Sequence, residues 1–192
     1  RVTLKAPDAL VKPRRDRAVA YLKDNPRLTD PPSADNDQAP AIAQRPRIAQ
    51  RNKTFDPNFL VIERGTHVEF PNWDPFSHNV FTRSEPAPPF DLGRYPRGQA
   101  KTYQFNHVGR VQLFCNIHPQ MHAEIRVVPN RYHDRVDARG QFVIEGVPPG
   151  KHKLVLWHAQ LGKTTRTVAV SARQPTRLNG LSLQLQDPGL FQ

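Results

Sequence analysis

The sequence predicts an all-β protein, and two observations support that prediction. Apolar and polar residues alternate over short runs through most of the chain, which is the period of a half-buried strand. Turn signals separate these runs, and the 192 residues include 10 Gly and 20 Pro. One segment, residues 14–24, fits a short helix or a strand equally well, so the sequence leaves that choice open.

The first clear strands lie within residues 59–70, where a break at Arg64-Gly65 divides two β runs. Val68 and Phe70 share one face of the second run, while His67 and Glu69 occupy the other. This alternation predicts a strand with one buried face.

Residues 100–115 predict another pair of strands. In the second of them, Val111, Leu113 and Cys115 fall on one face, so we expect the Cys115 thiol to point inward. The next strand is predicted at residues 123–128.

The last third of the chain continues the strand pattern. Its turn signals include Gly140 and the Pro-Pro-Gly stretch at residues 148–150. Four further strands are predicted, at residues 141–146, 152–158, 164–171 and 177–185.

The net charge is +11, from 28 basic and 17 acidic side chains. Residues 1–53 carry 12 basic and 6 acidic side chains, residues 54–130 carry 7 of each, and residues 131–192 carry 9 and 4. Such basic flanks attract polyanions in general. The basic residues are scattered, without a striped helix or interleaved aromatic residues, so nucleic acid is not expected as a partner.

No apolar run approaches the roughly 20 residues that span a bilayer, so we expect no transmembrane segment. The chain starts at Arg1 rather than Met, and we expect that an export signal has been removed. The expected location is therefore the periplasm, the cell envelope or the extracellular space.

All the sulfur in the chain lies in one short segment. Cys115 and Met121 are the only residues of their types, and His118 stands midway between them. A lone Cys excludes an internal disulfide, and in an exported protein a free thiol is a liability unless something such as a metal occupies it. His78 follows a predicted strand among turn residues and is the best candidate for a fourth partner.

A thiolate, two imidazoles and a weak thioether form the ligand set of a blue-copper electron-transfer centre. The two imidazoles and the thiolate lie in a trigonal plane, and the Met bond is long and axial. The alternative is that these residues have no metal-binding role: a buried Cys lies beside a core Met, and the His is only a surface residue.

Residues 47–128 resemble a cupredoxin. The resemblance rests on "FDPNFLVIERGTHVEFPNWDPFSHNVF" and "GRVQLFCNIHPQMHAEIRVV". The Cys-x-x-His-x-x-Met spacing is that of amicyanin, and the wider pattern is similar to methylamine-utilization-type cupredoxins of bacterial envelopes. The resemblance implies a Greek-key β-sandwich that binds one type 1 copper ion.

By position, the resemblance implies His78, Cys115 and His118 as equatorial ligands and Met121 as the axial ligand. Asn79 would tie the two ligand loops together by hydrogen bonds. Asn116 stands where amicyanin has Thr after the Cys, which affects hydrogen bonding at the sulfur. Phe114, Asn116 and Pro119 are the remaining expected neighbours of the ligands.

The other six histidines show no metal-ligand spacing and are expected not to be ligands. His122 follows Met121 directly and is expected at the surface, pointing away from the site. The others are His67, His107, His133, His152 and His158.

The flanks resemble a second β family. "VDARGQFVIEGVPPGKHKLVLWH" (136–158) is similar to the carboxypeptidase-regulatory-like, transthyretin-type β-sandwich, and "DRAVAYL" (16–22) resembles one of its strands. We therefore expect a discontinuous, small β-sandwich domain from residues 1–24 and 130–192, a loop at 25–45, and a cupredoxin domain at 46–129 inserted between them. The alternative is that the first 45 residues are an arm packed on the cupredoxin.

These observations lead to the expectation of a one-electron carrier that is not an enzyme. Its partner would be a redox protein or an anionic component of the envelope. Two rivals remain: a copper carrier without redox traffic, and a structural envelope or filament subunit. Copper carriers tend to have Met-rich runs or an exposed Cys-x-x-Cys, and this chain has neither.

Overall fold

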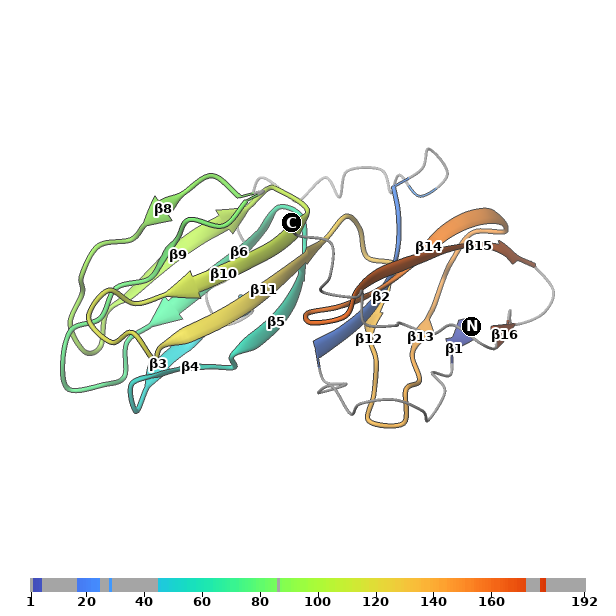
Figure 1. Ribbon diagram of the computed structural model, residues 1–192. Coiled ribbons are helices and arrows are strands. Elements are labelled where there is room, and N and C mark those ends of the chain that lie inside the picture. Colours follow the sequence, from blue (N-terminus) through green and yellow to red (C-terminus); the bar gives the residue numbers. More distant parts are fainter. Residues whose placement is uncertain are drawn as a thin grey trace, which may run out of the picture. The chain divides into compact units, whose positions relative to one another are not determined.

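The computed structural model describes residues 2–4, 17–24, 28, 45–85, 87–171 and 177–178. Over these ranges the regular elements are strands without an α-helix, which confirms the all-β prediction (Figure 1). Accordingly, no helix in the described part is long and apolar enough to cross a membrane.

The contacts divide the chain into two compact units. The inserted unit is residues 31–129, and the terminal unit combines residues 1–30 with residues 130–192. The loop expected at 25–45 lies outside the described residues, apart from Leu28 and Arg45.

The inserted unit is built from two facing β layers. One is a five-stranded sheet in the order β5-β11-β10-β7-β8, in which β5 runs parallel to β11. The other pairs β6 with β9, and the hairpin β3–β4 joins it through parallel bridges from Arg47 to Glu69 and from Gln50 to Asn72. The strands are β3 (Ala49–Arg51), β4 (Thr54–Asp56), β5 (Phe59–Glu63), β6 (Thr66–Pro71), β7 (Phe81–Thr82), β8 (Phe90–Asp91), β9 (Ala100–Phe105), β10 (Gly109–Phe114) and β11 (His122–Val128).

Inward side chains of both layers form one core. Val68 and Phe70 of β6 are fully buried and share a cluster with Val111 and Leu113 of β10 and with Ile125 of β11. Burial of this apolar surface is the main source of the unit's stability, at roughly 1.5–3 kcal/mol for each large side chain. The predicted inward faces of β6 and β10 are therefore confirmed.

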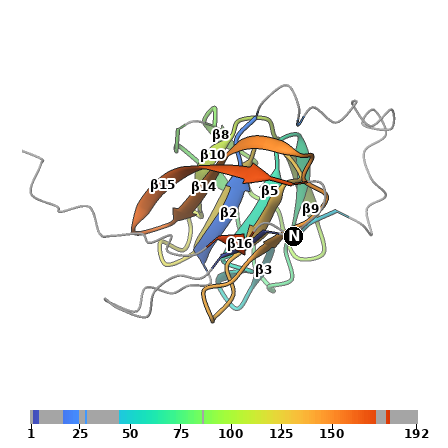
Figure 2. The same ribbon diagram turned by 90° about the vertical axis from the view of Figure 1, so that its right-hand side faces the viewer.

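The terminal unit joins both ends of the chain in one sheet, in the order β12-β2-β14-β15. Figure 2 shows β15, β14 and β2 following one another. Its strands are β1 (Val2–Leu4), β2 (Ala18–Leu22), β12 (His133–Arg135), β13 (Val143–Ile144), β14 (Gly150–His158), β15 (Gly162–Val170) and β16 (Arg177–Leu178), and β13, β1 and β16 form a second sheet.

The structure resolves the choice left open at residues 14–24, because Ala18–Leu22 form a strand whose five residues are all buried. Five strands were not predicted: β3, β4, β7, β8 and β12. Each is two or three residues long, which is too short to display an alternating pattern. Beyond Leu178, the strand predicted at 177–185 lies outside the described residues.

Candidate metal centre

Three potential metal ligands converge at one end of the inserted unit. His78 lies just before β7, where its backbone forms a bridge with Tyr95. Cys115 directly follows β10 and continues its inward face. His118 lies in the short loop that leads from Cys115 to β11, and this loop turns through a hydrogen bond from Met121 N–H to the His118 carbonyl (2.9 Å).

The donor atoms of these residues are close enough to share one metal ion. His78 Nδ1 lies 3.1 Å from His118 Nδ1 and 3.8 Å from Cys115 Sγ. All three donor atoms lie within 4.8 Å of one another. A metal with bonds of about 2.0 Å to nitrogen and 2.3 Å to sulfur holds its ligand atoms roughly 3.3–3.8 Å apart. The arrangement therefore fits one small metal ion.

The site is largely buried. His78 is fully buried, Cys115 is 3% exposed, and His118 is half-buried. Met121 is fully buried in the same cluster as Cys115. A thiolate and neutral imidazoles in an apolar surrounding favour copper or zinc over hard cations such as Mg²⁺.

Asn79 links the two segments that carry the donors. Its side-chain oxygen accepts a hydrogen bond from the Asn116 N–H at 2.8 Å, and its side-chain nitrogen donates to Asp91 Oδ1 at 3.1 Å. Asn116 directly follows Cys115 in the chain. This bond therefore connects the segment of His78 to the loop of Cys115, the role expected for Asn79.

The sequence analysis did not identify Asp74, which binds His78 at the ring nitrogen that faces away from the other donors. Asp74 Oδ2 lies 2.8 Å from His78 Nε2, and the carboxylate is almost fully buried. An ionised carboxylate accepts from Nε2–H, which leaves Nδ1 unprotonated and facing Cys115 and His118. A carboxylate that fixes the tautomer of a ligating histidine in this way is a common partner in metal sites. The sequence signal that could have indicated this role is the position of Asp74, four residues before His78.

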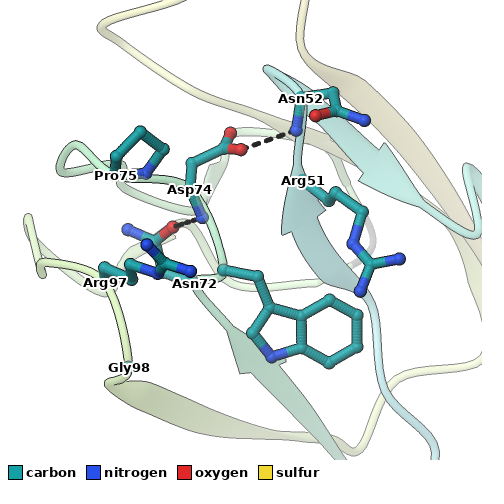
Figure 3. Close-up of a pocket in the computed structure, with 8 residues that line it drawn as sticks. Arg51, Asn52, Asn72, Asp74, Pro75, Arg97 and Gly98 are labelled. Atoms are coloured by element: carbon teal, nitrogen blue, oxygen red, sulfur yellow. Dashed lines mark hydrogen bonds between the residues drawn. The ribbon is translucent and has the colours of Figure 1, made fainter.

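A tight hairpin turn holds Asp74 in place. The turn between β3 and β4 consists of Asn52 and Lys53, which both have φ of 54°, in the left-handed region. This turn type directs the backbone N–H groups of both residues to the Asp74 carboxylate, at 2.6 Å and 2.8 Å. Figure 3 shows the bond from Asn52.

The electrostatics of the site favour an ionised Asp74. Burial by itself would raise the pKa of this carboxyl group, but the hydrogen bonds from Lys53 N–H, His78 and Asn52 N–H outweigh burial and lower the pKa below its ordinary value.

The pKa of His118 is also lowered, by desolvation and by electrostatic interactions with His78 and Lys53, against the opposing effect of Asp74. A lower pKa keeps the His118 ring neutral, which is the form that binds metals.

Aromatic rings cover part of the site. The Phe76 ring centroid lies 5.2 Å from that of His78 and 5.5 Å from that of His118, and Phe76 is 38% exposed. Of the remaining expected neighbours, Phe114 packs its ring against Phe81, while Asn116 and Pro119 are exposed.

The other histidines lie apart from this group. Among the described residues, the one group of histidine, cysteine and acidic side chains arranged to hold a metal is His78, Cys115 and His118. His122 is exposed. His152 and His158 are buried in the terminal unit and bond to backbone groups.

No protein-family model and no curated protein matches the chain. Among solved structures it is similar to a Cu-containing nitrite reductase from Thermus scotoductus SA-01, with 28% identity and a TM-score of 0.42. This match covers 44% of the chain and 22% of the reductase chain, so the chain spans about a fifth of that protein.

The chain is also similar to two amicyanin variants. One, in the reduced state, has 20% identity and a TM-score of 0.43, and the match covers 47% of this chain and 88% of amicyanin. The other, in its Cu(I) form, has 17% identity and a TM-score of 0.41, with coverage of 44% and 82%. Each match covers less than half of this chain.

Proposed function

We propose that the inserted unit is a cupredoxin of the amicyanin type that binds one type 1 copper ion and carries single electrons. The observation that carries the proposal is the convergence of Cys115 Sγ, His78 Nδ1 and His118 Nδ1 at one end of a β-sandwich. His78, Cys115 and His118 would bind the ion, and Met121 would be the weak axial ligand. Copper bound by such a set exchanges one electron between Cu(II) and Cu(I).

Three features of the surroundings support electron transfer rather than transport of copper. Asp74 fixes His78, and Asn79 fixes the loop after Cys115, so the ligands are held by a rigid scaffold. Little rearrangement between the two oxidation states favours fast electron transfer. His118 is the most exposed of the three donors and lies beside the exposed Phe76, which gives electrons a short route to the surface.

The proposal extends to the place of action and to the terminal unit. We place the protein in the bacterial periplasm or cell envelope, on the resemblance of its sequence to envelope cupredoxins. The terminal unit would be a carboxypeptidase-regulatory-like β-sandwich, and its basic character would hold the copper unit near an anionic envelope component. On this proposal the protein is a carrier and not an enzyme.

The visible absorption spectrum after addition of one equivalent of Cu(II) to the full chain tests the proposal. We expect an intense blue thiolate-to-copper band in the natural protein. Cys115→Ser should abolish the band while leaving the fold intact, because it removes the thiolate. His122→Asn is the matched control, since His122 is exposed and one residue beyond Met121, and it should keep the band.

Each other outcome points to a rival. A colourless protein that binds one copper ion as Cu(I) would indicate a copper carrier. Failure to bind copper would favour a structural role. A band that survives in Cys115→Ser would refute the assignment of Cys115.

A further inference from the structure

A patch of cations and exposed aromatic rings adjoins the candidate metal centre. The patch consists of Arg51, Lys53, Trp73, Phe76 and Arg97, and all five side chains are exposed. Trp73 and Phe76, each 38% exposed, are two of the three large apolar side chains that are exposed in the described part of the chain. Exposed aromatic and Arg side chains in one place are typical of the centre of a protein interface.

The cations lie directly over the rings. The Arg51 guanidinium carbon is 4.5 Å from the centroid of the Trp73 ring, and Lys53 Nζ is 5.3 Å from the centroid of the Phe76 ring. Such cation–π contacts hold the charges in place without neutralising them. Within the described residues, neither Arg51 nor Arg97 forms an ion pair with a carboxylate, so both guanidinium groups can receive one from outside.

An open pocket of about 500 Å³ lies between the two arginines. Figure 3 shows the side chains of Arg51 and Arg97 flanking it, with Asn72 and Asp74 between them. The buried Asp74 does not compete for these guanidinium groups, because its oxygens already accept from two backbone N–H groups and from His78. The pocket thus offers two forked, planar donors to an incoming carboxylate.

Hydrogen bonds and ring contacts connect the patch to the metal centre. Arg51 and Lys53 belong to the β3–β4 hairpin, whose turn is bound to Asp74, and Asp74 in turn holds His78. The Phe76 ring contacts both Lys53 and His118, and the centroids of the Phe76 and His118 rings are 5.5 Å apart. A partner seated on the patch would therefore lie beside His118, the most exposed of the three donors.

We propose that this patch is the docking site for the acidic surface of an electron-transfer protein, with one carboxylate of that partner seated between Arg51 and Arg97. The identification of the partner as an electron-transfer protein rests on the proposed function, whereas the recognition of an acidic surface rests on the patch alone. A protein surface is the expected occupant because the two exposed rings provide apolar contact area around the charged pocket, which a small anion would leave uncovered.

Binding of a deca-glutamate peptide to the metal-free full chain tests the patch. The indole N–H signals of an ¹⁵N-labelled sample report on Trp73 and Trp157 separately, since the chain contains only these two tryptophans. We expect the peptide to shift the Trp73 signal in a saturable way and to leave the signal of the buried Trp157 unchanged. Raising the salt from about 10 mM to about 150 mM should weaken binding several-fold, because exposed charges are screened.

Substitutions separate the pocket from the general basic charge. Arg51→Gln with Arg97→Gln should weaken binding roughly tenfold, since two carboxylate contacts are lost. Arg139→Gln, an exposed arginine in a turn of the terminal unit, removes charge elsewhere and should change binding less than about twofold. Arg97→Gln alone should also weaken binding without a direct effect on the Trp73 ring.

Three results would overturn the docking site. The peptide could leave the Trp73 signal unmoved, or the Arg139 variant could lose as much affinity as the Arg51 and Arg97 variants. Free glutamate at the same carboxylate concentration could also shift Trp73 as strongly as the peptide, which would identify a small anion as the occupant. Because no copper is used, a missing blue band would refute the proposed function without affecting this result.

Discussion

At the scale of single residues, Asp74 is the side chain on which the candidate site most depends beyond its ligands. It binds His78 on one side and the turn of residues 52–53 on the other. Two of the donors to its buried carboxylate, the backbone N–H groups of Asn52 and Lys53, lie 22 and 21 residues before it in the chain. Loss of its charge should therefore affect both the ligand and the hairpin.

Asp74→Asn is expected to lower the affinity for copper by about 10- to 100-fold, the usual effect of removing the partner of a ligating histidine. The amide cannot hold the His78 tautomer as a carboxylate does. Competitive titration with a Cu(I) chelator measures the affinity. Asp91→Asn, which changes an exposed carboxylate bonded to Asn79, is a control that should have a smaller effect. Equal losses in the two variants would argue against the role given to Asp74.

The lowered pKa of Asp74 predicts a pH dependence of stability in the metal-free protein. A carboxyl group with a lower pKa in the folded than in the unfolded state stabilises the fold above its unfolded pKa of about 3.9. This contribution is lost as the pH falls through the lower folded value. Urea unfolding of the natural protein and Asp74→Asn at several pH values measures it. The difference in unfolding free energy should be largest near neutral pH and shrink in strong acid, and a constant difference would contradict the prediction.

At the scale of elements, strand β10 shows how a local pattern positions a functional group. Val111 and Leu113 are fully buried, and Cys115 continues the same face at 3% exposed. The two-residue period of the strand thus directs the Cys115 thiol to the interior, one residue after the last β10–β11 pair, Phe114 with His122. The Cys115 position is consequently secured by the packing of Val111 and Leu113.

Leu113→Ala should lower the unfolding free energy by about 2–5 kcal/mol, because it leaves a cavity in a fully buried part of the core. Thr102→Ala on the exposed side of β9 is the control and should cost less than about 1 kcal/mol. Chemical unfolding of the metal-free proteins gives both values. Similar losses in the two variants would show that Leu113 does not lie in a tightly packed core.

At the scale of the whole molecule, every strand of the inserted unit pairs with another strand of the same unit. The strands from β3 to β11 pair with one another, and the Pro46 carbonyl accepts a hydrogen bond from the Glu69 N–H of β6 at 3.0 Å. The unit also has a hydrophobic core of its own. These are the properties of a segment that can fold independently.

A fragment of residues 46–129 is therefore expected to fold and to bind copper with the same visible spectrum as the full chain. Circular dichroism and the copper titration check these two properties. An unfolded fragment would show that the unit requires the rest of the chain. A folded fragment without copper binding would show that the site needs residues outside 46–129.

The sequence by itself determined the all-β class and most strands, because alternation is a local property with a period of two. It also identified Cys115, His118 and His78 as candidates, since rare sulfur and imidazole groups stood out at a spacing that suits a metal. The two-residue alternation also predicted that Cys115 points inward, because it shares a strand face with Val111 and Leu113. The short strands β3, β4, β7, β8 and β12, of two or three residues each, lack such a signal and were found only in the structure.

Only the tertiary structure decided which distant groups meet. His78 and Cys115 are 37 residues apart, and their donor atoms meet because β7 and β10 pair in one sheet. Asp74 and the left-handed turn of Asn52 and Lys53 meet because β3 pairs alongside β6. Likewise, the pairing of β2 with β14 decided that residues 18–22 form a strand. Such contacts depend on backbone pairing and packing between distant segments, which a local pattern of residues does not encode.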